Sequence, residues 1–194
     1  MPGLFEPTPD GGAAVVLDEV EISIIRSLAV QLMELVGPGA EPSDDPLAEL
    51  FAEGPSEPPS DPVLHRLFPD AYGGPGDKET EELRAASSEF RRFTENDLRD
   101  RKRRDAVAVI RSLDGLSASA GGGAVLKVEG ESAQQWLGAL NDLRLAISAR
   151  LEITGEEDAD LLYQLPDEDP RKPMVMAYLW LGGLQETLVE TLMS

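Results

Sequence analysis

The residues that carry most enzyme chemistry are scarce in this chain. Its 194 residues include a single histidine, His65, and no cysteine. This composition excludes disulfides, thiolate metal sites, cysteine nucleophiles and metal sites built from several histidines. His65 lies between Leu64 and Arg66, a setting typical of a partly exposed helix residue rather than of a catalytic base. We therefore expect no catalytic residue, no metal site and no cofactor.

Two loop segments match known ligand-binding motifs only in part. Residues 73–80 contain glycines and a lysine, but Asp77 stands where a Walker A loop requires glycine, so a turn is expected there. Acidic residues alternate over 156–160 as in a calcium loop, yet Leu161 occupies the position that an EF-hand reserves for glycine. Two carboxylates far apart in sequence could still act as an acid–base pair, so a carboxylate-based enzyme stays an alternative.

A basic stretch stands out because the chain is acidic overall. The chain has 37 acidic residues against 17 Lys and Arg, a formal net charge of −20, whereas residues 91–112 carry a net charge of +4. This stretch could recognise an anionic partner. Alternatively, it could pair with the protein's own carboxylates, because Asp97/Arg101 and Asp100/Arg104 have helical i,i+4 spacing. The candidate interaction patch consists of Arg91, Arg92, Arg99, Arg101, Lys102, Arg103 and Arg104.

A second candidate site is a polar strip on the predicted helix over residues 131–153. Asn141, Arg144 and Ser148 interrupt its apolar residues. An arginine near core positions needs hydrogen-bond partners, which we expect from the last helix. The strip is interpreted either as a buried structural network or as a binding groove. Its candidate residues are Trp136, Asn141, Asp142, Arg144, Arg150 and Gln185.

Apolar residues at helical spacing predict four main helices. The second of them is long, so a kink or break is expected near Thr94, and Phe90 and Phe93 are expected to be buried. One capped turn is predicted over 45–51 and another over 61–68. The four helices cover residues 18–36, 77–113, 131–153 and 173–193.

The remaining segments predict loops and a small β element. Proline and glycine are dense over residues 37–62, and residues 155–173 form an acidic segment, so both are expected to be loops. Residues 13–17 and 124–128 are aliphatic and could pair as a two-stranded ribbon. The sequence thus predicts a mainly α protein, a helical bundle forming a single domain over 1–194.

Four strings in this chain resemble an actinobacterial family, the domain of unknown function numbered two-zero-one-seven. They lie at residues 61–72, 89–95, 136–145 and 178–186, and the most specific is Trp136-Leu-Gly-Ala-Leu-Asn-Asp-Leu-Arg-Leu145. The resemblance covers most of the chain, in order. It supplies no reaction. It implies a cytoplasmic protein, often encoded near the proteolysis adaptor ClpS, and hence a link to regulated proteolysis.

The first hypothesis is a non-enzymatic intracellular domain that interacts with another protein or regulates it. The alternative is a nucleic-acid-binding transcriptional regulator that uses residues 91–111, although a net charge of −20 repels phosphate backbones. The first ten residues lack the basic and apolar regions of a signal peptide, and no apolar run reaches the ~20 residues of a membrane span. We expect a cytoplasmic protein with no membrane partner.

Overall fold

The computed structural model describes residues 3–39, 52–73, 78, 80–116 and 123–193. Helices dominate, and the strands form one small antiparallel sheet, which confirms the mainly α class with a small β element. In chain order the elements are β1 (Glu6–Pro7), β2 (Ala13–Asp18), α1 (Glu19–Val36), α3 (Pro62–Leu67), α4 (Glu81–Asp114), β3 (Gly123–Val128), α5 (Gly130–Arg150), α6 (Glu156–Tyr163) and α7 (Lys172–Met193).

The predicted ribbon is present and gains a third strand. β2 pairs with β3 in antiparallel register, with Ala13 opposite Val128, and β1 pairs with the other edge of β2. The sequence analysis did not predict β1. Burial alternates along β2 and β3, so one face of the sheet packs into the core while the other faces solvent.

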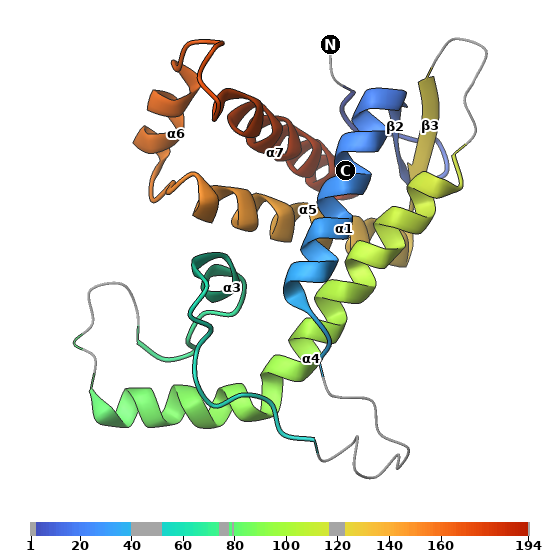
Figure 1. Ribbon diagram of the computed structural model, residues 1–194. Helices are drawn as coiled ribbons and strands as arrows, with labels where there is room; N and C mark the ends of the chain where they lie inside the picture. The colour runs from blue at the N-terminus through green and yellow to red at the C-terminus, as the bar shows by residue number, and fades with distance from the viewer. Residues whose placement is uncertain (1–2, 40–51, 74–77, 79, 117–122, 194) are drawn as a thin grey trace.

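α1 begins where the sequence predicts, because its capping residues are local. The Asp18 carboxylate accepts a hydrogen bond from the Glu21 amide at 2.8 Å, and the Glu21 carboxylate accepts one from the Asp18 amide at 2.9 Å. Ile25, Ala29 and Leu32 are buried along one side of the helix. That side packs against the second half of α4, which lies next to α1 (Figure 1).

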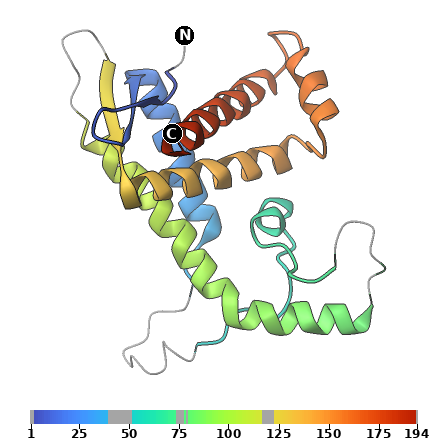
Figure 2. The same cartoon turned by 180° about the vertical axis from the view of Figure 1, so that it is seen from behind.

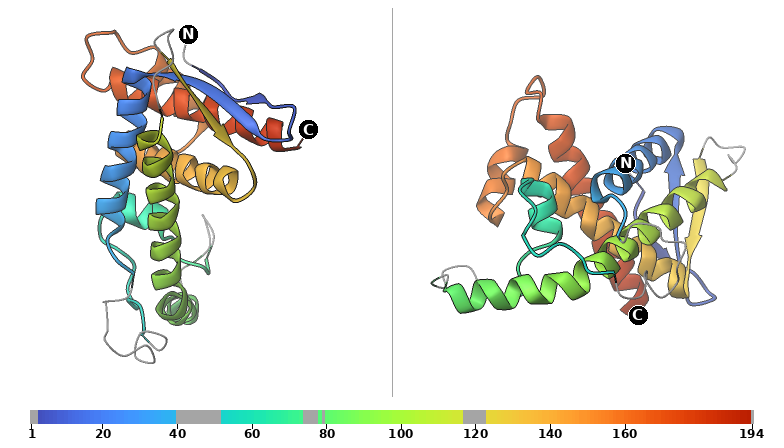
Figure 3. Two further views of the ribbon diagram at one scale, coloured as in Figure 1. Left: turned by 90° about the vertical axis from the view of Figure 1, so that its right-hand side faces the viewer. Right: turned by 60° about the horizontal axis from the view of Figure 1, so that its bottom comes forward.

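α4 is a single helix that bends near its middle (Figures 1 and 3). Of the kink or break expected near Thr94, the structure has the kink, because Thr94 does not start a new helix. Its hydroxyl instead donates to the Phe90 carbonyl at 2.8 Å, a hydrogen bond that often bends helices. The bend separates the half of α4 that packs on α1 and α5 from a half that extends away from the bundle (Figure 2).

The expected burial of Phe90 and Phe93 is wrong. Their exposed fractions are 45% and 63%. Among the described residues, the extended half of α4 contacts the chain between residues 52 and 72, for example through the Gly54 amide, which donates to the Arg92 carbonyl. Phe90 meets Tyr72 edge to face, with ring centroids 6.0 Å apart. The Arg92 guanidinium lies 5.5 Å from the centre of the Phe93 ring.

α5 and α7 complete the core beneath the sheet. Trp136 on α5 is 1% exposed, donates to the Ser112 hydroxyl at 3.1 Å and meets Phe5 edge to face. Leu181, Leu184 and Leu188 of α7 are fully buried. The buried residues of α5 and α7 recur at the helical spacing from which these two helices were predicted. They include Trp136, Leu140, Leu143, Ile147, Leu181, Leu184 and Leu188.

The two predicted loops have different outcomes. The predicted turn over 61–68 is α3, capped by Asp61, and His65 is exposed on it. The predicted turn over 45–51 lies outside the described residues. The acidic segment 155–173 is not all loop, because α6 occupies Glu156–Tyr163. Its start is fixed by the Asp158 carboxylate, which accepts hydrogen bonds from the backbone amides of Thr154 and Gly155. Among the described residues, none of the helices has the combination of length and apolarity that a membrane span requires.

Candidate binding surfaces on α4 and α5

The Arg91 side chain binds partners inside the protein. Only 5% of this residue is exposed. Its guanidinium contacts the Glu95 carboxylate at 2.5 Å and the Asp70 carboxylate at 2.8 Å, and it donates to the Phe68 carbonyl at 3.1 Å. Arg91 therefore fastens the end of α3 to α4 rather than facing a partner.

Three more basic residues of the predicted patch pair internally. Arg99 contacts Glu95 at 2.7 Å and covers the Phe68 ring, with its guanidinium carbon 4.5 Å from the ring centre. Lys102 contacts Asp142 of α5 at 2.6 Å, and Arg92 contacts Glu53 at 2.7 Å. These partners belong mostly to segments distant in sequence, so helical spacing alone could not identify them.

The expected pairs Asp97/Arg101 and Asp100/Arg104 form no ion pair in the described part of the chain. Arg104 instead donates to the Asp100 main-chain carbonyl at 3.4 Å. Arg103 donates to the Met33 carbonyl of α1 at 2.8 Å, so it serves the contact between α1 and α4. Internal pairing thus accounts for one part of the basic stretch and leaves another part exposed.

The exposed part is the arginine face, which we define as Arg101, Arg104 and Arg111 on the outer side of α4. These residues line a shallow groove of about 1050 Å³, together with Leu98 and Ala108 of α4 and Gln135 of α5. Leu98 is 39% exposed, so the groove also offers apolar surface. None of the three arginines forms an ion pair with a carboxylate in the ranges that the structure describes.

Two buried carboxylates lie behind the arginine face, between α4 and α5. Burial raises the pKa of Asp142, and the Lys102 charge only partly opposes this rise. Burial also raises the pKa of Asp105, against the opposing charge of Arg101. The Asp105 carboxylate lies so close to Gly138 that a Cβ at that position would be 2.5 Å from its Oδ2.

The predicted polar strip separates into different environments. Trp136 and Asp142 are buried, whereas Asn141 and Arg150 are exposed. Arg144 is partly buried and donates to the Gln185 side-chain oxygen at 2.7 Å, the contact between α5 and α7 that the sequence analysis expected. Gly182 lies beside this guanidinium, and a Cβ there would be in ordinary van der Waals contact with it, 3.5 Å from Arg144 Nε.

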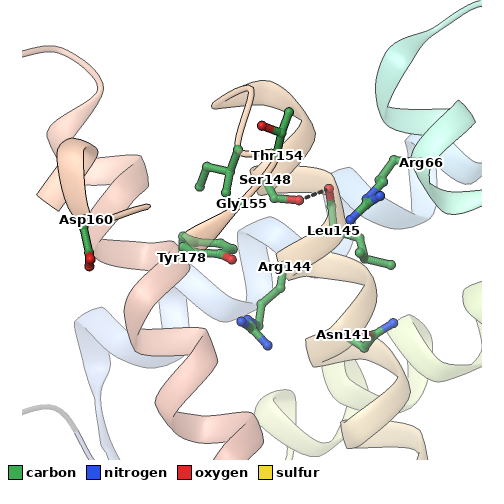
Figure 4. Close-up of a pocket in the computed structure, with 10 residues that line it drawn as sticks. Arg66, Asn141, Arg144, Leu145, Ser148, Thr154, Gly155, Asp160 and Tyr178 are labelled. Carbon is green, nitrogen blue, oxygen red and sulfur yellow. Dashed lines mark hydrogen bonds between the residues drawn. The ribbon is translucent and has the colours of Figure 1, made fainter. Parts of the chain in front are cut away.

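Arg144 borders a pocket of about 550 Å³ between α3, α5, α6 and α7 (Figure 4). Its guanidinium lies beneath the Tyr178 ring, 5.3 Å from the ring centre. Asn141 points in another direction, and Asp160 lies apart on α6 (Figure 4). The convergence of Asn141, Arg144 and a carboxylate that an acid–base enzyme would require is therefore absent from this pocket. Within the described residues, no three His, Cys, Asp or Glu side chains are grouped closely enough to hold a metal ion.

The family resemblance is confirmed. Residues 2–192 match the family described as "Domain of unknown function (DUF2017)", and the chain belongs to this family. The chain is 32% identical over 185 residues to the "Putative oxidative stress regulator AosR" of Mycobacterium leprae (strain TN), a match that covers 90% of this chain and 79% of the relative. It is also 32% identical over 184 residues to the "Oxidative stress regulator AosR" of Mycobacterium tuberculosis (strain ATCC 25618 / H37Rv), with the same coverage. No solved structure matches the chain significantly.

Proposed function

We propose that this protein is a cytoplasmic regulator that acts by binding another protein through its arginine face. The names of its relatives support a regulatory role, since both are described as regulators of oxidative stress. The 194 residues contain no cysteine. An oxidative signal therefore cannot act on a thiol of this chain, and a regulatory role would be exerted through contacts with other molecules.

The observation that carries the proposal is the exposure, in an acidic protein, of three arginines with no carboxylate partner among the described residues. Arg101 and Arg104 are one turn of α4 apart, Arg111 follows two turns later, and all three are exposed beside one groove. Arg91, Arg92, Arg99 and Lys102 have carboxylate partners, whereas Arg101, Arg104 and Arg111 have none in the described ranges. Arginine is enriched in protein interfaces, where its planar group binds carboxylates in bidentate fashion.

The same groove indicates what its partner looks like. The arginines favour an acidic segment, and the exposed Leu98 beside Ala108 favours apolar side chains on that segment. Asp97 and Asp100 also border the groove, and the whole protein carries a charge of −20. Both features repel a continuous phosphate backbone more than they repel a short acidic peptide. We therefore favour a protein partner over nucleic acid.

A capture experiment tests this function. We expect the wild-type protein, immobilised and exposed to an actinobacterial lysate, to retain a partner that an Arg101→Glu/Arg104→Glu/Arg111→Glu variant does not retain. Arg103 is left unchanged because it bonds to α1. Retention of the same proteins by both forms would contradict the proposal.

A matched variant separates the effect of the arginine face from that of net charge. Lys127, Arg150 and Arg171 are exposed on other elements, so changing all three to Glu alters the net charge by the same amount. We expect this control to retain the partner. If the retained protein is a component of regulated proteolysis, the link that the family resemblance implies gains direct support.

Titration with duplex DNA at low and high salt tests the runner-up function. Phosphate contacts give a steep decrease in affinity as salt rises. We expect no binding at low salt. Binding that is steeply salt-dependent and lost in the arginine-face variant would replace a protein partner with nucleic acid.

A further inference from the structure

Arg144 is a partly buried cation that contacts no carboxylate among the described residues. The comparable cations Arg91, Arg99 and Lys102 each lie within 2.5 to 2.7 Å of a carboxylate. The side chain that Arg144 contacts is Gln185, whose amide oxygen is neutral. The Nε atom of Arg144 is buried and has no hydrogen-bond partner among the described residues. Removing a charge from water without an opposite charge is costly, so a carboxylate or phosphate bound beside Arg144 would stabilise this arrangement.

The pocket beside Arg144 is lined by cationic and polar groups that suit an anion. Arg66 of α3 contributes a second cation, and Thr154 contributes a polar group. Asp160 is the carboxylate of this lining, and it lies away from Arg144 on α6 (Figure 4). A positively charged pocket in a chain with 37 acidic residues is not explained by composition.

Neighbouring side chains hold the Arg144 guanidinium in place. Tyr178 covers its face, and Gln185 fixes one of its terminal nitrogens. A guanidinium held in this way loses little conformational freedom when it binds a carboxylate or a phosphate. Leu145, Ile153 and the Tyr178 ring give the pocket apolar walls beside the cations.

We propose that this pocket binds a small organic anion whose carboxylate or phosphate group contacts Arg144, with Arg66 as the second cation. The volume of about 550 Å³ suits a small molecule rather than a macromolecule. This site lies between α3, α5, α6 and α7 and is separate from the arginine face of α4. The two proposals can therefore fail independently.

A single-residue change provides a sharp test because Gln185 is one chemical step from a carboxylate. Gln185→Glu places a carboxylate at the 2.7 Å contact with Arg144 and preserves the shape of the side chain. We expect this variant to unfold at a higher temperature than the wild type and to bind anions at least about tenfold more weakly, because an internal carboxylate competes with the ligand.

Isothermal titration calorimetry with succinate and with inorganic phosphate measures the binding, and succinamide serves as a neutral control. We expect saturable binding of at least one anion to the wild type, with the stronger of the two identifying the preferred group. Arg144→Gln should lose this binding. Arg150→Gln removes the same charge from an exposed position on the same helix and should keep it.

Three outcomes would overturn the proposal. The first is that neither anion binds the wild type at millimolar concentration. The second is that succinamide binds as well as succinate. The third is that the Gln185→Glu and Arg144→Gln variants, checked for native helical content by circular dichroism, bind anions as the wild type does.

Discussion

Burial of the Asp105 and Asp142 carboxylates is unfavourable to the free energy of folding. Both carboxylates lie between α4 and α5, and burial raises the pKa of each. Lys102 contacts Asp142 at 2.6 Å, whereas Asp105 has cations near it without a hydrogen bond that compensates its burial. Buried carboxylates with raised pKa values occur at functional sites more often than elsewhere. These two lie directly behind the arginine face.

The pH dependence of stability follows from the sign of the Asp105 shift. A carboxylate whose pKa is raised in the folded state favours folding below its unfolded pKa, and this contribution is lost as pH rises through the folded value. At neutral pH the ionised Asp105 therefore destabilises the folded state. We expect Asp105→Asn to raise the midpoint of thermal unfolding at pH 7 and to leave it unchanged below pH ~3, where the wild-type side chain is also neutral.

Asp114 offers a control of opposite sign. Its hydrogen bond to Arg26 lowers the pKa of this exposed carboxyl. Its contribution is present above its unfolded pKa and is lost as pH falls through the folded value. Asp114→Asn should therefore lower the midpoint slightly at pH 7. An Asp105→Asn variant that is less stable than the wild type at pH 7 would contradict the role given to burial.

At the scale of elements, the contact between α4 and α5 depends on a glycine, which has no side chain. Gly138 lies where the Asp105 carboxylate approaches α5, and a Cβ there would be 2.5 Å from Oδ2. Alanine is about 1 kcal/mol more favourable than glycine inside a helix, but forcing atoms into a packed site costs about 1–3 kcal/mol. We expect Gly138→Ala to lower the free energy of unfolding by about 1 kcal/mol, measured by urea denaturation.

A double-mutant cycle identifies the cause of that loss. In an Asp105→Ala background the carboxylate is gone, so Gly138→Ala should become stabilising by about 1 kcal/mol through helix propensity alone. An equal loss of stability in both backgrounds would show that the α4–α5 contact is limited by other atoms.

The elements also show how far sequence reasoning reaches. The starts of α1 and α3 could be predicted because Asp18 and Asp61 cap amides only two or three residues away. β1 was missed because its two residues are defined by pairing with β2, not by a local pattern. α6 was missed because an acidic segment was read as solvated charge, whereas Asp158 uses its carboxylate to cap a helix.

The candidate site was harder to predict than the fold for the same physical reason. The basic stretch was evident in the sequence. Whether one of its cations forms an internal ion pair depends on carboxylates far along the chain. Glu53, Asp70 and Asp142 lie 39, 21 and 40 residues from their respective partners Arg92, Arg91 and Lys102. A contact between Arg144 and the last helix was expected because an arginine near core positions needs hydrogen-bond partners. The exposure of Phe90 could not be read from the helix pattern, since only the tertiary arrangement leaves that half of α4 uncovered.

At the scale of the whole molecule, charge is segregated in three dimensions. The chain carries a net charge of −20, yet part of its basic stretch is buried in ion pairs that join α3, α4 and α5. The remaining arginines gather on the uncovered side of α4. A negatively charged body with one basic face presents a defined orientation to an acidic partner, and such complementarity accelerates association more than it increases affinity.

The most direct test of the binding role of the arginine face is the dissociation constant of the captured partner, measured at two salt concentrations. We expect Arg101→Glu/Arg104→Glu/Arg111→Glu to weaken binding at least about tenfold, and the wild-type affinity to fall as salt rises. The Lys127→Glu/Arg150→Glu/Arg171→Glu control should bind within about twofold of the wild type. Equal affinity of the wild type and the arginine-face variant, or a wild-type affinity that does not change with salt, would contradict the account.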